Sequence, residues 1–528
     1  MQTTQTEFAI PNGITNNNLL DLLGKNFTVK TRPQKTVVRT IYDSFDWRLY
    51  CKGAALELHD DGNVHQLFWR ESKDAALKPL FNQPTAPKFV HDLPTSEFRQ
   101  QLAPVLEMRE LVQQVKIGTR QTVVNVLNVE DKTVVRILIE EHSTRPPGSK
   151  SSCRIGRRVV VRAVRGYLKP YQRLVDFLYE QKFVAVKNNL LRLALAETGR
   201  TPGDYSSKLN LRLDPEMRAD QAAREILLRL LNIMQINESG VCEGTDTEFL
   251  HDFRVAIRRT RSALSQIKAV LPEAAVNKYR AEFAWLGQIT TPTRDLDVYL
   301  LSFDDYRERI PANAREDLKP LHDFLQAHRE VEQAALAKAL KSARYRSLVN
   351  NWRALLESSP PTRGLPANAL RPVFPLADER IWHVYTRALK QGRAIGPDTP
   401  AVALHELRKT CKKLRYLMEF FQSLYPAREI KQLIHVLKSL QDNLGQFQDY
   451  EVQVETLKRF SHQMVEEDKV NPDTLLAMGM LIERLEDSQK LARKEFSERF
   501  EAFAADENVE HFRKIFVENR PSEQDIEA

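Results

Sequence analysis

A repeated motif constrains this chain more than any other feature. Residues 251–261 read HDFRVAIRRTR and residues 405–415 read HELRKTCKKLR, which is the same order of residue types 154 positions later. Asp295 and Asp449 each stand 44 residues after the histidine of their motif and keep the same separation. A threonine six residues before each histidine, Thr245 or Thr399, is predicted to cap the helix. The repeat predicts two similar helical units that pack as pseudo-symmetric halves.

Each copy places its cations at fixed offsets from the histidine. The offsets of three, seven and ten residues fall within about a quarter of the circumference of a helix with 3.6 residues per turn. The motif therefore predicts one basic stripe on each helix. The stripes comprise His251, Arg254, Arg258 and Arg261 in the first copy, and His405, Arg408, Lys412 and Arg415 in the second. Arg259, Lys409, Lys413 and Lys438 are secondary candidates on neighbouring faces or on the next helix.

Charge is concentrated in the repeats. The 528-residue chain has a net charge of only +8, whereas residues 251–262 carry four arginines and one acid, and residues 405–416 carry five cations and one acid. A cationic stripe is commonly a solvated face, but such faces usually mix signs, because like charges on one helix repel by a few tenths of a kcal/mol per pair. A bound polyanion would offset this repulsion through charge-assisted hydrogen bonds to its phosphates.

Metal binding is the rival explanation for the two histidines. Neither stripe has an acid or a cysteine at a spacing typical of metal ligands, and the four cysteines form no CxxC pair. The sequence therefore indicates no metal and no cofactor. Such widely spaced cysteines are typical of a reducing compartment, and no apolar run is long enough to span a bilayer. We expect a cytoplasmic protein without a membrane partner.

The two parts of the chain differ in pattern. Up to about residue 170 the chain favours short β-rich runs such as KTVVRTIYDSF and RVVVRAVRG, separated by turn sequences. Beyond it, long segments repeat apolar residues at helical spacing. The predicted fold class is α+β: an antiparallel β-barrel domain over residues 1–200, an all-α bundle over residues 215–505, and a disordered tail over residues 515–528.

The two histidine motifs carry a family resemblance. HDFRVAIRRTRSAL followed by TRDLDV, and HELRKTCKKLRYLMEFF followed by LGQFQDYEV, resemble the CHAD domain over about residues 215–500. That family consists of helical bundles of two related halves around a basic channel that binds inorganic polyphosphate. The resemblance implies polyphosphate as the ligand of the two stripes.

A second resemblance concerns the N-terminal part. IYDSFDWRLYCKGAALELHDDG is similar to a segment of the CYTH domain, a triphosphate-tunnel barrel often found ahead of CHAD. Active members carry an ExExK motif that holds a divalent metal, and the matching positions here are Thr3, Gln5 and Glu7. Glu57 and His59 stand where two arginines are usual, and Arg162 and Arg165 stand where the family tends to place an acidic and lysine-bearing strand. The metal-binding carboxylates are thus replaced, and we expect no catalytic residues and no enzymatic activity.

The sequence favours a non-enzymatic polyphosphate-binding protein, associated with polyphosphate granules. One alternative is a metal-dependent tripolyphosphatase or polyphosphatase acting through the N-terminal barrel. Another is a general polyanion or nucleic-acid binder. Nucleic acid is disfavoured because only Tyr416 adjoins the stripes, whereas proteins that bind single strands interleave aromatic residues with cations.

Overall fold

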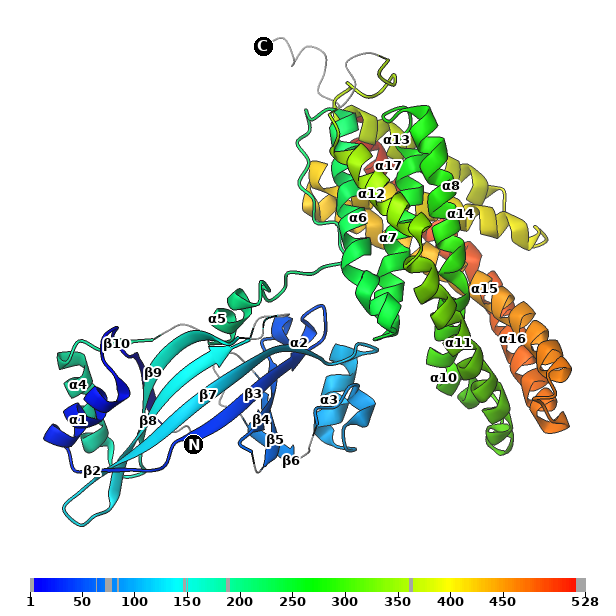
Figure 1. Cartoon of the computed structure of the whole chain (residues 1–528). Coiled ribbons are helices and arrows are strands. Elements are labelled where there is room, and N and C mark those ends of the chain that lie inside the picture. Colours follow the sequence, from blue (N-terminus) through cyan, green and yellow to red (C-terminus); the bar gives the residue numbers. More distant parts are fainter. Residues whose placement is uncertain are drawn as a thin grey trace, which may run out of the picture. The chain divides into compact units, whose positions relative to one another are not determined.

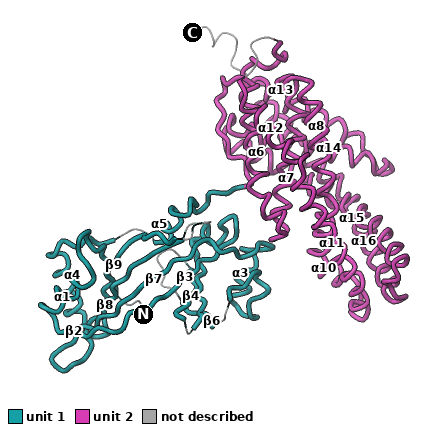
Figure 2. The backbone as a smooth tube through the Cα atoms, viewed as in Figure 1, with its two compact units in different colours: residues 1–206 teal, residues 207–528 magenta. Residues whose placement is uncertain are grey.

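The chain forms two compact units. A computed structural model describes residues 4–62, 64–71, 78–82, 85–145, 149, 151–186, 190–359 and 364–518. Unit 1 comprises residues 1–206 and unit 2 comprises residues 207–528 (Figure 2). Unit 1 is built on one antiparallel sheet and unit 2 is helical (Figure 1), so the predicted fold class, an antiparallel β domain followed by an all-α domain, is confirmed.

Unit 1 contains a sheet in the order β10-β1-β9-β8-β7-β3-β4-β5-β6, with β2 paired to β7 and every pairing antiparallel. The strands are β1 (Gln5–Ala9), β2 (Val29–Thr31), β3 (Lys35–Asp43), β4 (Ala55–Asp60), β5 (His65–Arg70), β6 (Lys78–Asn82), β7 (Val112–Leu127), β8 (Thr133–Thr144), β9 (Cys153–Ala163) and β10 (Val184–Ala185). The helices are α1 (Asn16–Asn26), α2 (Arg48–Cys51), α3 (Glu97–Leu106), α4 (Leu168–Glu180) and α5 (Leu190–Glu197).

Helices cover different parts of this sheet. Alternating apolar residues of the central strands, such as Ile137 and Val159, pack against Leu23 of α1 and Leu174 of α4. A second cluster joins β4 and β5 to α3, and a third joins Ile117 of β7 to α5. The sheet is therefore held by three separate apolar clusters rather than by one.

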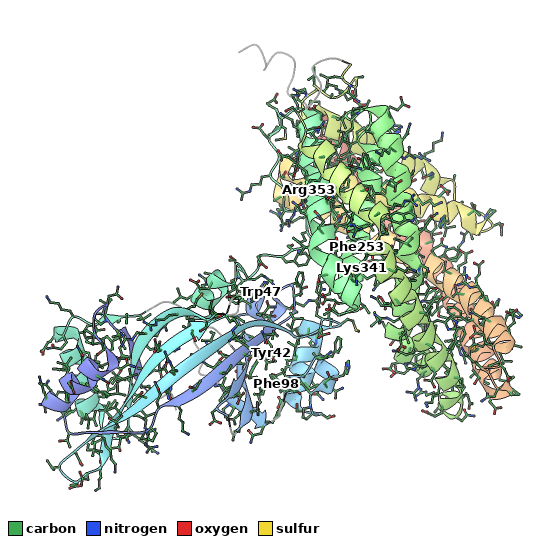
Figure 3. All side chains as sticks on the ribbon, viewed as in Figure 1. Tyr42, Trp47, Phe98, Phe253, Lys341 and Arg353 are labelled. Atoms are coloured by element: carbon green, nitrogen blue, oxygen red, sulfur yellow. The ribbon has the colours of Figure 1, made fainter. Side chains whose placement is uncertain are left out.

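Unit 2 consists of long helices with buried apolar faces. They are α6 (Ala219–Glu243), α7 (Thr247–Gln266), α8 (Glu273–Ile289), α9 (Thr291–Leu301), α10 (Phe303–Arg309), α11 (Lys319–Leu340), α12 (Ala343–Glu357), α13 (Val373–Arg393), α14 (Ala401–Phe421), α15 (Ala427–Glu466), α16 (Pro472–Phe503) and α17 (Asp506–Arg513). Phe253 of α7 is fully buried and lies inside the bundle (Figure 3). α15 and α16 run side by side into an arm that also includes α10 and α11 (Figure 1).

The helices of unit 2 repeat with the spacing of the motif. α6, α7 and α8 begin at Ala219, Thr247 and Glu273, and α13, α14 and α15 each begin 154 residues later. The halves differ beyond this point, because the first half breaks between α8 and α9 at Thr290, just before Pro292. Proline cannot donate the hydrogen bond that continues a helix. The position equivalent to Pro292 is Gln446, which lies within the uninterrupted α15.

Equivalent residues of the two halves meet directly. Arg218 and Pro372, which are 154 positions apart, form an isolated antiparallel bridge. The Ala219 amide donates to the Arg371 carbonyl at 2.8 Å, and the Val373 amide donates to the Met217 carbonyl at 2.8 Å. Each bond is the symmetry mate of the other, which is the signature of a two-fold contact. The predicted pseudo-symmetric halves are confirmed.

Two local predictions are wrong. Thr245 does not cap α7, because Asp246 does so by accepting hydrogen bonds from the Glu248 and Phe249 amides. Thr399 does not cap α14 either, and its hydroxyl accepts from the Gly396 amide instead.

The start of the predicted tail is ordered. Lys514–Glu518 forms a short π-helical turn in which Ile515 and Phe516 are buried. Phe516 packs against the edge of Tyr425 with ring centroids 5.0 Å apart, so this apolar contact explains the difference. Residues 519–528 of the predicted tail lie outside the described residues.

Candidate anion-binding groove

The two basic stripes meet at a groove between α7 and α14. Arg258 and Arg261 come from α7, Lys409, Lys412 and Lys413 come from α14, and all five line one cavity of about 650 Å³. We call it the α7–α14 groove. Its other lining residues are Ser262, Ser265, Asn277, Arg280, Ala281, Ala284 and Tyr416. Six cations and no acid therefore line a surface to which both repeats contribute.

Crowding of like charges has an electrostatic consequence. Burial, followed by the positive charges of Arg408 and Arg258, lowers the pKa of Lys412 from its usual 10.5 to about 8. Arg258 belongs to the first repeat and Lys412 to the second, so the charges of the two repeats act on one another across the groove. A bound anion would relieve this repulsion and favour the protonated lysine.

The N-terminal ends of the stripes lie outside the groove. Arg294 donates a 3.2 Å hydrogen bond to Nδ1 of His251, which therefore acts as an acceptor. The equivalent ring nitrogen of His405 is hydrogen-bonded to Oε1 of Gln448. Gln448 stands 154 residues after Arg294, so equivalent positions hold the histidine in the two repeats, on α9 in the first and on α15 in the second. Neither histidine lines the groove, and the predicted role of both as phosphate ligands stays a prediction.

Arg254 is held by the end of α8 and the start of α9. Its guanidinium donates to the Gly287 carbonyl at 3.2 Å, to the Thr290 hydroxyl at 2.7 Å and to the Thr291 hydroxyl at 3.0 Å. Burial, assisted by the charge of Arg258, lowers the pKa of Arg254 to about 10. These contacts join α7 to the junction of α8 and α9, so Arg254 has a structural role there.

The second repeat differs at the equivalent position. Arg408 forms a 2.9 Å ion pair with Asp449. Part of each stripe is thus engaged by contacts inside unit 2.

Glu419 removes two further candidates from the groove. Its carboxylate pairs with Arg415 at 2.8 Å and with Arg259 at 2.7 Å. Arg259 also donates to the Ser207 carbonyl at 3.0 Å. Neither arginine lines the groove, and the acid engages both. Lys438 is exposed on α15 and is also absent from the lining.

Sequence reasoning missed several cations near the groove. Arg280 of α8 lines it, and a neighbouring pocket of about 280 Å³ adds Lys268, Arg380 and Arg387. None of the four belongs to the repeated motif: Arg280 lies on α8, Arg380 and Arg387 lie on α13, and Lys268 lies in the turn after α7. Only the packing of α8 and α13 beside α7 and α14 brings them to the same surface.

Unit 1 contains a charged network on one face of its sheet. Glu57 pairs with His59 at 2.9 Å and with Arg70 at 3.2 Å. Although burial alone would raise the pKa of Glu57, His59, Arg39 and Arg70 hold it below its usual value. Glu57 is therefore an ionised carboxylate whose negative charge is compensated by the neighbouring bases.

A neighbouring part of the same sheet also pairs its acids with bases. Glu140 pairs with His142 at 3.4 Å, and Glu7 pairs with Arg158 at 2.9 Å. Of the other two positions matched to ExExK, Gln5 lies on β1 and Thr3 lies outside the described residues. Arg162 and Arg165 are exposed. In the described part of the chain, no three His, Cys, Asp or Glu residues come together in a way that could hold a metal ion.

The groove and the duplicated helices define unit 2 as a two-repeat helical domain with a cationic surface between its repeats. Residues 225–458 match the model of the CHAD domain family, so this part of the chain is a CHAD domain, as the two histidine motifs indicate. No curated protein matches the chain.

Solved structures give the following similarities. The CHAD domain from the plant Ricinus communis is 28% identical, with a TM-score of 0.48, over 57% of this chain and 96% of that one. PptA from Streptomyces chartreusis is 17% identical, with a TM-score of 0.43, over 54% and 99%. A putative adenylyl cyclase from Hippeastrum, described as having a dominant triphosphatase activity, is 13% identical, with a TM-score of 0.27, over 39% and 100%. Within the described ranges, no helix has the length and apolar character needed to cross a bilayer.

Proposed function

We propose that the α7–α14 groove binds inorganic polyphosphate. The observation that carries this proposal is the lining itself, in which six cations from α7, α8 and α14 face one cavity without an acid. Arginine and lysine donate charge-assisted hydrogen bonds to phosphate oxygens, and each neutralised phosphate releases counterions. Polyphosphate offers one negative charge at each internal phosphate, so a linear chain suits a groove lined by several cations.

The lining favours polyphosphate over nucleic acid. Of the described residues that line the groove, Tyr416 alone is aromatic. Proteins that bind single strands stack several successive bases on aromatic rings, and this stacking is worth about 1–3 kcal/mol per base. Polyphosphate has no bases, so its binding does not depend on stacking against aromatic rings. Association with polyphosphate granules inside the cell belongs to the same proposal.

Unit 1 has a different part in the proposal. We infer that it does not hydrolyse phosphate chains, because Glu7, Glu57 and Glu140 of its sheet are engaged by bases. A divalent metal in a phosphoryl-transfer site needs carboxylate oxygens that are open to it. Unit 1 then serves binding, targeting or partner contact.

The binding experiment uses the full chain. Long-chain polyphosphate, RNA and single-stranded DNA are titrated in parallel at physiological salt, with Arg258→Ala/Arg261→Ala for the first repeat and Lys409→Ala/Lys413→Ala for the second. Each pair should weaken polyphosphate binding at least tenfold, since a hydrogen bond to a charged group contributes about 1.5–3 kcal/mol. The control Arg346→Ala/Arg499→Ala removes two exposed arginines that line neither basic cavity.

Circular dichroism establishes that each variant is folded. If both groove variants are folded and bind long-chain polyphosphate as tightly as the control, the groove is not the contact surface. Equal or tighter binding of RNA by the parent protein would favour the general polyanion binder instead.

A further inference from the structure

We propose that the pocket beside α13 is a second anion subsite, which takes the continuation of a polyphosphate chain whose first part lies in the α7–α14 groove. This pocket, the α13 pocket, is lined by Lys268, Arg380, His383, Arg387 and Lys413 together with Ser265, Gln266, Arg280, Val384 and Thr410. The inference rests on the proposed function and adds a preference for long chains.

The two cavities are continuous along their walls. Ser265, Arg280 and Lys413 line both of them. The groove has six cations and the α13 pocket has five, of which Arg280 and Lys413 are shared, so the pocket adds three cations and one histidine. Among the residues that the structure describes, no acid lines either cavity. A ligand that leaves the groove past Lys413 therefore meets further positive charge rather than open solvent.

Contacts within the bundle hold the α13 pocket in place. Nε of Arg380 donates to the Gln266 carbonyl at 2.8 Å, at the C-terminal end of α7. Burial, followed by the positive charge of Arg387, lowers the pKa of Lys413. Lys413, which lines both cavities, is thus repelled by a cation of the α13 pocket, as Lys412 is repelled by cations of the two stripes.

The repeat explains why the cationic surface continues on one side only. Glu419 of the second repeat pairs with Arg415 and Arg259. The residues 154 positions away from these three are Ser265, Arg261 and Lys413, so the first repeat has a serine where the second has the acid. Arg261 and Lys413 consequently face the cavities, whereas their counterparts are held in ion pairs.

The remaining cations of the α13 pocket also lack counterparts. The positions equivalent to Arg380 and Arg387 are Ile226 and Ile233, which are buried in α6. The position equivalent to Arg280 is Ile434. At the symmetric site Arg229 stands at the position equivalent to His383, and its guanidinium donates to the Leu209 carbonyl at 3.2 Å. The described residues of that site therefore form no cationic path of this kind, and the chain has one extended exit instead of two.

A second linked subsite predicts a dependence on chain length. Once one part of a long ligand is bound in the groove, binding of the next part in the α13 pocket is intramolecular. The overall affinity for a ligand that reaches both cavities therefore exceeds the affinity of either cavity alone. Tripolyphosphate is short and should depend mainly on the groove. Long-chain polyphosphate should depend on both cavities.

The first test is the variant Lys268→Ala/Arg387→Ala in the full chain. Both residues are exposed. Affinities for tripolyphosphate and long-chain polyphosphate are measured by calorimetry at the same salt, with Arg346→Ala/Arg499→Ala as the charge-matched control. The loss for the long chain should exceed the loss for tripolyphosphate by at least fivefold, and the control should show no such difference. Equal losses for the two ligands, or a long-chain loss no larger than that of the control, would overturn the second subsite.

The second test introduces the missing acid. Ser265→Glu should place a carboxylate between Arg261 and Lys413, as Glu419 lies between their counterparts, and should weaken long-chain binding at least fivefold more than Ser347→Glu on the exposed face of α12. Equal effects of the two substitutions would overturn the argument from the repeat. If the parent protein binds neither ligand, the proposed function itself fails, whereas binding that does not strengthen with chain length removes only the second subsite.

Discussion

Lys412 should make polyphosphate binding depend on pH. In the free protein its pKa is lowered from 10.5 to about 8, by burial and by Arg408 and Arg258. A phosphate beside the amino group favours the charged form, so the pKa rises on binding and the protein takes up a proton. If binding restores the usual value, the linkage relation gives a fall in affinity of about tenfold from pH 7 to pH 9.

The assay measures affinity for long-chain polyphosphate at pH 7, 8 and 9 at constant ionic strength. Lys412→Arg is the matched variant, because arginine keeps its charge throughout this range and should remove most of the tenfold fall. Titration of the terminal phosphates affects both proteins equally and cancels in the comparison. If Lys412→Arg shows the same fall as the parent, or if the affinity of the parent is constant from pH 7 to pH 9, Lys412 does not contact the ligand.

The same shift has a consequence for stability. The folded chain releases the Lys412 proton near pH 8, whereas the unfolded chain retains it up to about pH 10.5. The unfolded state binds more protons in this window, so the contribution of Lys412 to the free energy of unfolding rises with pH between about 8 and 10.5. Lys412→Met removes the charged group, and its urea unfolding curve should show a smaller rise over that window than the parent.

Four other outcomes are expected. The logarithm of the polyphosphate binding constant should fall linearly and steeply with the logarithm of the salt concentration, and a flat dependence would exclude the groove cations as the contacts. Arg254→Ala should lower the free energy of unfolding by about 2–4 kcal/mol, since three hydrogen bonds from one guanidinium are lost, and an unchanged urea midpoint would contradict its structural role. Gly392→Ala should destabilise the chain by about 1–3 kcal/mol, because the added Cβ would lie 1.9 Å from the ring of Phe500, and thermal unfolding measures this directly. Full-length protein with Mg²⁺ or Mn²⁺ should release no phosphate from tripolyphosphate above background, and turnover that depends on the metal would instead support the tripolyphosphatase alternative.

The repeat in the sequence predicts much of unit 2. The shared offset of 154 fixes the starts of α6, α7 and α8 relative to α13, α14 and α15, because the halves have the same helical period and connections. It also identifies five residues that line the groove, Arg258, Arg261, Lys409, Lys412 and Lys413. Local spacing is enough for these predictions because the residues lie on two helices that each present one face.

Spacing within one helix cannot show what the next helix contributes. A stripe that covers a quarter of a helix runs from buried to exposed positions, so Arg254 faces Thr290 while Arg258 faces the groove. The pairing of Arg259 with Glu419 joins residues 160 positions apart and depends on how α7 crosses α14. Arg280 reaches the groove only because α8 packs beside α7. These assignments depend on tertiary packing, which the motif does not encode.

The bridge between Arg218 and Pro372 also bears on how such a chain could arise. Duplication and fusion of a gene whose product forms a homodimer yields a contact of this kind, in which each half meets the other through the same residues. In a homodimer both subunits have the same sequence, so the residues equivalent to positions 265 and 419 would be identical. Both would be serine, with two open exits, or both would be glutamate, with two closed exits. In one covalent chain the two copies are free to differ, and this chain has Ser265 at one exit and Glu419 at the other.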